Sequence, residues 1–100
     1  MTLRNEATDR LFDVILSLRD REECYLFFED VCTVKELQDL TQRYKVANPL
    51  LEKKNYNTIS AETGMSTATI SRVNRCLFYG NGGYQMAIDR QKEGNNADAK

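Results

Sequence analysis

Short polar and basic side chains gather in the run STATISRVNR, which spans Ser66 to Arg75. Hydroxyl groups donate hydrogen bonds to phosphates and base edges, threonine and alanine methyls contact the methyl of thymine, and arginine pairs with guanine or phosphate. These residue types therefore support the recognition of a nucleic acid, a chemistry in which no covalent bond is made or broken.

The segment from Asn57 to Leu77 is predicted to form two helices joined by a tight turn. Gly64 suits a left-handed turn, Ser66 is a good N-cap, and a buried face is expected at Ile70, Val73 and Leu77, which repeat at helical spacing. The opposite face carries the small and basic residues Thr67, Ala68, Thr69, Ser71, Arg72 and Arg75. This layout is that of a helix-turn-helix, although the spacing alone fits a plain helical hairpin equally well.

The run STATISRVNR resembles the recognition helix of the Trp repressor family, and the wider pattern is similar to its YerC/YecD branch. The matching features, within roughly residues 25–90, are Leu50-Leu51, Tyr56, Gly64 to Arg75 and Tyr79-Gly80-Asn81-Gly82-Gly83-Tyr84. The resemblance implies an all-α fold of about six helices and an intertwined homodimer. Two reader helices in such a dimer would meet successive major grooves of a roughly palindromic site on double-stranded DNA.

Both helices of the motif are expected to supply DNA contacts. The first turn of the second helix matches positions that face the operator in the family, and serines and the helix dipole favour phosphate. Lys53 and Lys54 are expected to face solvent, with phosphate as the alternative. The predicted contacts are Asn57, Ser60, Ser66, Thr67, Ala68, Thr69, Ser71 and Arg75.

The resemblance also implies a possible ligand pocket, because Trp repressor binds an amino acid corepressor between two arginines. Arg43 and Arg72 match that pair, and Thr33 matches a threonine at the pocket edge. Val73 stands where the family has a small residue, and its branched side chain would take space that an indole ring needs. Tryptophan binding is therefore not expected, and another effector is left open. The alternative for Arg43 is an ion pair with an acidic residue of the N-terminal half.

The charge is unevenly distributed. The net charge is only −1, which is low for a DNA-binding protein. Residues 1–42 hold 5 basic and 10 acidic groups, whereas residues 43–78 hold 6 basic groups and 2 acidic ones. Positive charge is thus concentrated around the predicted reader, where phosphates would lie.

The rest of the chain reads as helices within a single domain over residues 1–94, followed by a flexible tail at 95–100. An apolar stripe predicts a helix over residues 3–18, and Asp20 and Thr33 are expected to cap the next two helices. Pro49 predicts a break or kink near Val46 to Asn48, or else the start of a separate short helix. Asn57 is expected to cap the next helix. The glycine-rich run after Leu77 predicts a turn into a last helix over residues 85–93.

Several classes of protein are disfavoured by the composition. No apolar run approaches 18 residues and no signal peptide follows Met1, so a cytoplasmic protein without a membrane partner is expected. Three cysteines and no histidine argue against a disulfide framework and a zinc site, and the cysteines are expected in the core. No catalytic constellation or cofactor motif is found, so an enzyme is not expected. The rival to a DNA-binding regulator is a helical protein-interaction module with the same fold.

Overall fold

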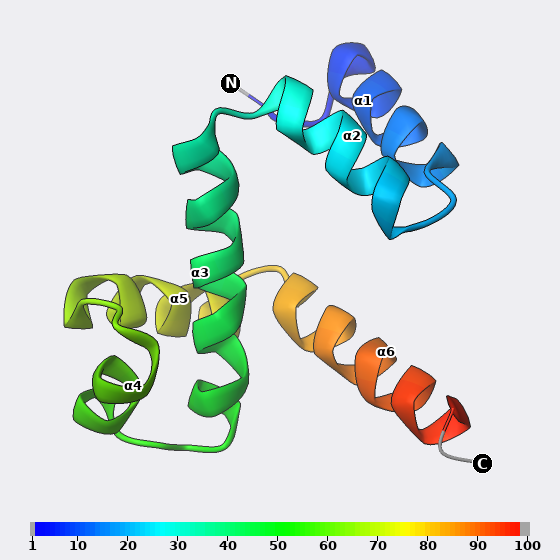
Figure 1. The fold of residues 1–100 in the computed structure, drawn as a ribbon. Helices are drawn as coiled ribbons and strands as arrows, with labels where there is room; N and C mark the ends of the chain where they lie inside the picture. The colour runs from blue at the N-terminus through cyan, green and yellow to red at the C-terminus, as the bar shows by residue number, and fades with distance from the viewer. Residues whose placement is uncertain (1, 99–100) are drawn as a thin grey trace. The chain divides into compact units, whose positions relative to one another are not determined.

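The computed structural model describes residues 2–98, with side chains up to residue 94. This part of the chain forms helices without a strand, in agreement with the all-α prediction. The six helices in chain order are α1 (Glu6–Ser17), α2 (Arg21–Val31), α3 (Val34–Leu51), α4 (Tyr56–Thr63), α5 (Thr67–Tyr79) and α6 (Gly83–Asp98) (Figure 1). None of them has both the length and the apolar character needed to cross a bilayer.

The chain divides into two compact units, one reaching to Leu37 and one starting at Gln38. The first turn of α3 belongs to the first unit and the remainder of α3 to the second. The single domain expected over residues 1–94 stays a prediction, as does the flexible tail. Helix α6 continues to Asp98, so the predicted end of the last helix at residue 93 is too early.

The first unit contains α1 and α2, whose N-termini are fixed by side-chain caps. Asn5 accepts a hydrogen bond from the backbone N–H of Thr8 at 3.0 Å, and Asp20 accepts one from Glu23 at 2.9 Å. Helix α1 therefore begins at Glu6 instead of residue 3, whereas the predicted Asp20 cap is confirmed. No residue of either helix is buried, so the apolar stripe of α1 is only partly covered within this unit.

A capping box begins α3, as the sequence predicts. The Glu36 backbone N–H donates to the Thr33 hydroxyl at 3.1 Å, and the Thr33 N–H donates to the Glu36 carboxylate at 2.8 Å. The hydrogen bonds from the backbone and side chain of Thr33 lower the pKa of Glu36 from its usual value. The start of α3 is thus held by two reciprocal bonds.

Helix α3 runs unbroken through Pro49, so the predicted break near Val46 to Asn48 and the separate short helix are wrong, whereas the alternative of one helix that tolerates the proline is confirmed. Pro49 lies in the last turn, where only one intrahelical bond is lost to its missing N–H. Val46, Ala47 and Leu50 are all buried and hold this end of the helix against the core. Burial of these side chains outweighs the local preference of proline.

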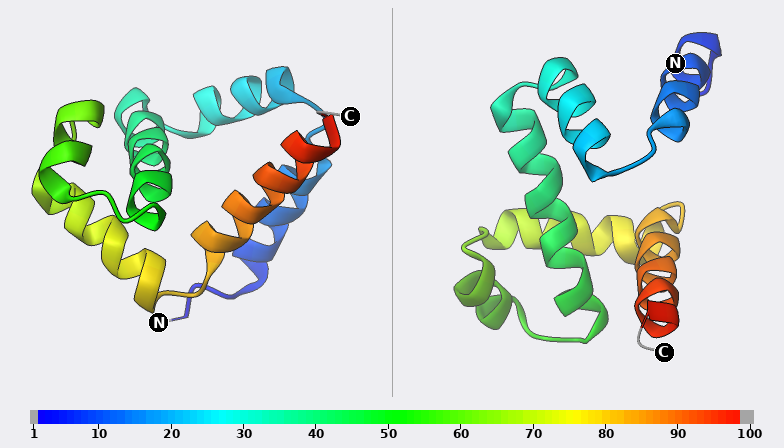
Figure 2. Two further views of the ribbon diagram at one scale, coloured as in Figure 1. Left: turned by 90° about the horizontal axis from the view of Figure 1, so that it is seen from below. Right: turned by 45° about the vertical axis from the view of Figure 1, so that its right-hand side comes forward.

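The core of the second unit lies where α3 packs across α5, with α4 beside them (Figures 1 and 2). Its largest fully buried side chains are Val46, Ile59, Ile70 and Val73. The face of α5 predicted from helical spacing is confirmed, because Ile70, Val73 and Leu77 are exposed by 0, 1 and 8%. Tyr56, Met65 and Tyr84 pack around this cluster.

A short glycine-rich turn joins α5 to α6, as predicted. Gly80 ends α5 by donating its backbone N–H to the Cys76 carbonyl at 3.0 Å, and Gly82 has a φ of +82°. Helix α6 then begins at Gly83, two residues before the predicted start, and places Ile88 in the core.

The cysteines are not the core residues that the sequence suggested. Cys24 and Cys76 are exposed, and Cys32 is half-buried. All three are free thiols. Small apolar side chains of this kind can stay at a surface without the large penalty of exposing a bulky residue, so composition alone did not fix their place.

Candidate nucleic-acid interface

Helices α4 and α5 form the helix-turn-helix predicted from the sequence (Figure 1). Helix α4 starts earlier than expected, because Asn55 and not Asn57 is its N-cap. The Asn55 side chain accepts a hydrogen bond from the Thr58 N–H at 2.8 Å. Asn57 instead lies exposed in the first turn of α4. Gly64 ends the helix at a φ of +76°, in the left-handed region that glycine reaches without strain.

Two hydroxyls of α4 hold the turn. Ser60 donates to the Met65 carbonyl at 2.8 Å, and Thr63 donates to the Ile59 carbonyl at 2.7 Å. The Thr63 oxygen also accepts from the Met65 N–H at 3.2 Å. Ser60 was predicted to contact the DNA backbone, but its single proton is used inside the turn. Ser60 therefore supports the turn, and its contact with the DNA backbone stays a prediction.

Ser66 caps α5 as predicted. Its oxygen accepts from the Thr69 backbone N–H at 3.2 Å, and the Ser66 and Thr69 hydroxyls form a hydrogen bond at 3.1 Å. Either hydroxyl can donate that bond, so the one that accepts it keeps its proton for a ligand. The backbone N–H groups at this end of the helix also carry its positive dipole end, which attracts anions.

The face of α5 opposite the core is exposed and slightly hollowed. Ala68, Ser71, Arg72 and Arg75 lie on this face at helical spacing and, with Cys76, line a shallow cavity of about 530 Å³. All five are exposed, whereas Thr69 at the flank is half-buried. The predicted small and basic face thus exists as one surface, to which the exposed thiol of Cys76 adds a residue that the sequence analysis placed in the core.

Lys54 is exposed, as expected, and also makes two ion pairs. Its ammonium lies 3.3 Å from the Glu62 carboxylate on α4 and 3.9 Å from that of Glu52. It therefore ties the end of α3 to α4. Between residues 38 and 94, neither Arg72 nor Arg75 makes an ion pair, so both guanidinium groups are open to an anionic partner.

Of the residues of the predicted ligand pocket, Arg72 lines the shallow cavity on α5 and Arg43 does not. Thr33 belongs to the first unit and its hydroxyl caps α3. Arg43 is half-buried and, within the second unit, makes no ion pair. Val73 lies in the core and not among the residues that line the cavity at Arg72. The Val73 side chain fills the core, and its predicted clash with a bound indole ring stays a prediction.

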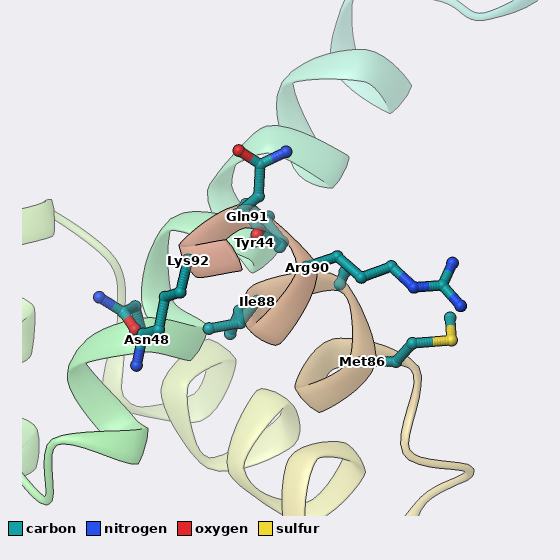
Figure 3. A pocket seen from close by; sticks show the side chains of 8 residues that line it. Tyr44, Asn48, Met86, Ile88, Arg90, Gln91 and Lys92 are labelled. Carbon is teal, nitrogen blue, oxygen red and sulfur yellow. The ribbon is translucent and has the colours of Figure 1, made fainter. Parts of the chain in front are cut away.

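A larger cleft of about 690 Å³ lies between α3 and α6 (Figure 3). Its walls combine Tyr44 and Asn48 of α3 with Met86, Ile88, Arg90 and Lys92 of α6. Tyr44 and Met86 are exposed by 44 and 51%, so much of the apolar wall faces outward. This cleft is lined by neither helix of the helix-turn-helix.

Comparison with known proteins places the chain in a family. Residues 6–92 match the family described as Trp repressor protein. The chain belongs to the Trp repressor family. It is 59% identical over 91 residues to the uncharacterized protein YerC of Bacillus subtilis (strain 168), covering 91% of this chain and 88% of YerC.

Solved structures agree with this assignment. A TrpR-like protein from Eubacterium eligens ATCC 27750 is 52% identical and superposes with a TM-score of 0.86, covering 90% of this chain and 93% of that one. A Staphylococcus aureus protein named for the Trp repressor is 54% identical with the same TM-score, and 90% of each chain is covered. The family and branch suggested by the sequence are therefore confirmed, and the family is one of regulators.

Proposed function

We propose that this protein is a sequence-specific DNA-binding transcriptional regulator that acts as a helix-turn-helix homodimer, and that it represses transcription without a tryptophan corepressor. The observation that carries the proposal is the exposed face of α5, where short and basic side chains stand opposite a fully buried face. A helix anchored on one side and lined with short residues on the other can enter a major groove.

The proposed contacts follow from the hydrogen-bond inventory of the motif. Thr69 can donate to a base edge or phosphate when Ser66 donates the bond between them, Thr67 and Ala68 lie at the exposed start of α5, and Asn57 lies exposed on α4. Ser66 contributes through its cap, which orients the free N–H groups of the first turn. Arg75 supplies a cation that no acidic group within residues 38–94 neutralises.

A homodimer is supported by the apolar surface that the single chain leaves uncovered. In the first unit, Leu11, Val14 and Val31 are exposed by 41, 44 and 55%, and no residue of α1 or α2 is buried. In the second unit, Tyr44 and Met86 remain exposed around the cleft between α3 and α6. Exposed apolar area of this extent favours association, and two copies would double the phosphate contacts.

Replacing Thr69 with glutamate tests the proposal. Residue 69 is the third residue of α5, so the introduced glutamate would complete an S-x-x-E capping box with Ser66 and keep the helix stable. The added negative charge would face phosphates. We expect Thr69→Glu to lose sequence-specific DNA binding by about 100-fold or more, because like charges at an interface cost several kcal/mol. Binding is measured on fragments selected from random DNA, at low salt and over a salt series.

The matched control is Thr69→Gln, which also completes the capping box but adds no charge. It should bind much more tightly than Thr69→Glu, and both variants should melt at least as high as the parent. A Thr69→Glu protein that binds selected DNA as well as the parent would show that α5 is not the reader.

The alternative is a protein-interaction module that has kept the fold, and the net charge of −1 favours it. Such a module would bind neither selected nor random DNA, even at low salt. The same binding series therefore separates the two functions.

A further inference from the structure

We propose that Arg72 reads a guanine in the major groove and so determines the sequence preference of the protein. This inference rests on the proposed function and assigns one residue of the interface a specific partner. The resemblance to the family placed Arg72 at a ligand pocket, whereas its surroundings on α5 suit a base contact.

The Arg72 side chain lies on the face of α5 opposite the core. Arg72 follows Ser71 and precedes Val73, whose side chain is 1% exposed. Together with Ile70 and Leu77, Val73 fixes the orientation of α5 against the core. Positions 68, 72 and 75 fall on the side of the helix opposite this buried face, at the three- and four-residue steps of one helical stripe.

Short side chains surround Arg72 and would let α5 come close to DNA. Arg72 has Ala68 one turn before it and Ser71 beside it, and these short side chains line the same cavity. Small neighbours allow the helix axis to come close to the floor of the groove, so that a long side chain between them reaches the base edges. Within residues 38–94 no acidic group pairs with Arg72, so its guanidinium is free to make two parallel hydrogen bonds.

Arg72 and Arg75 differ in their position along the axis of α5. At about 1.5 Å per residue, Arg72 lies roughly 7.5 Å along the axis from Thr67, and Arg75 about 12 Å from it. The major groove is about 12 Å wide. With its N-terminus in the groove, α5 therefore places Arg72 over the bases and Arg75 at the wall, where phosphates lie.

The guanidinium of arginine matches the O6 and N7 acceptors of guanine, which no other base presents in that pattern. The geometry thus predicts one G·C pair in each half-site that is specified by Arg72. Arg75 adds affinity that does not depend on sequence.

The test compares Arg72→Gln with Arg75→Gln, two exposed positions on the same stripe of α5. Each variant and the parent select fragments from a random DNA library, and affinities are then measured on the parent's preferred site, on every single-base change of it, and over a salt series. For Arg72→Gln we expect the guanine preference to vanish at one position per half-site, with an affinity loss on the parent site of about 10- to 100-fold. For Arg75→Gln we expect uniform weakening on all sites and a salt slope reduced by about 1.

Melting curves of both variants should match that of the parent, since neither side chain is buried. The proposal is overturned if Arg72→Gln weakens all sites equally, as Arg75→Gln should, or if it leaves the base preferences unchanged. A parent protein that binds no DNA at low salt would overturn the proposed function itself, and the inference with it.

Discussion

Each hydroxyl near the turn has one proton to donate, and the acceptor of that proton decides whether the residue can also donate to a binding partner. The proton of Ser60 goes to the Met65 carbonyl inside the motif. Ser66 and Thr69 share one hydrogen bond between their hydroxyls, so one of the two keeps a proton for a partner. Three residues that look alike in the sequence thus differ: Ser60 supports the turn, whereas Ser66 and Thr69 hold the cap and leave one proton free.

The prediction that tryptophan does not bind also rests on single residues. Val73 is buried in the core, and Arg43 does not line the cavity that contains Arg72. A tryptophan carboxylate would need both guanidinium groups at once. We expect titration calorimetry with L-tryptophan to show no saturable heat up to millimolar ligand, with L-alanine as the control for heats of dilution. Saturable heat with tryptophan alone would restore the corepressor.

At the scale of the helices, two glycines stand where any other residue would distort the motif. A Cβ at Gly80 would lie 2.3 Å from the Cys76 carbonyl oxygen, so the turn between α5 and α6 would have to move. Gly64 has open space around it but a φ of +76°. We expect Gly64→Ala to lower the free energy of unfolding by about 1–2 kcal/mol, and Gly80→Ala to lower it further.

Urea unfolding checks this order, with Gly83→Ala as the control. Gly83 begins α6 and has no positive φ, and a Cβ added there would meet no atom within 4 Å. Alanine there should leave the stability unchanged or raise it by up to about 1 kcal/mol. Equal losses at all three positions would contradict the account.

The capping box of α3 makes its start sensitive to pH. Hydrogen bonds from Thr33 lower the pKa of Glu36 in the folded protein, so the carboxylate form is favoured there. This contribution is fully present above the usual glutamate pKa and is lost as pH falls through the lowered value. We expect an NMR titration of Glu36 to show the lowered pKa, and Thr33→Ala to raise it towards the usual value.

Glu36→Gln provides the control, since it can keep the box without a charge. The stability of this variant should depend less on pH than that of the parent between about pH 5 and the acid limit of folding. Because alanine keeps the backbone N–H that is the largest cause of the lowered pKa, the rise in Thr33→Ala should be partial, and an unchanged Glu36 pKa would show that the Thr33 hydroxyl does not contribute.

Hydrogen bonds between residues close in the sequence could be predicted from it, whereas features that depend on tertiary packing could not. The caps at Asp20, Thr33 and Ser66 each depend on a side chain and a backbone group three residues apart, so the residue type and spacing suffice. Helix α3 continues past Pro49 because Val46 and Leu50 are buried in the core with residues of α5, and no local sequence pattern reveals this burial.

The candidate site divides in the same way. The small and basic face of α5 follows from helical spacing around Ile70, Val73 and Leu77. The sequence did not reveal that Lys54 is paired with Glu62, because that contact joins the end of one helix to the next across a bend. Cys76 was missed as a residue of the exposed face because a thiol fits core and surface alike.

At the scale of the whole molecule, the first unit leaves apolar side chains of α1 and α2 exposed, which a second chain can cover. We expect Val14→Lys to shift the protein from dimer to monomer, raising the dimer dissociation constant by about 10-fold or more, since a charge at a buried apolar interface loses its hydration. Sedimentation over a concentration series measures the change.

Asp13→Lys is the matched control, because it adds a lysine at a neighbouring exposed position that lies away from the apolar stripe. That variant should remain dimeric, and its melting temperature should rise with concentration like that of the parent. A parent protein that is monomeric at micromolar concentration would remove the proposed assembly.

The lack of any buried residue in α1 and α2 has a genetic consequence. If each chain needs a second chain to cover its apolar surface, a chain with an intact first unit and an altered α5 still forms mixed dimers with the normal chain. Such an allele, for instance Thr69→Glu, would be dominant over the normal one. A chain altered in α1, for instance by Val14→Lys, would not form mixed dimers and so would not impair the normal chain. Its allele would be recessive.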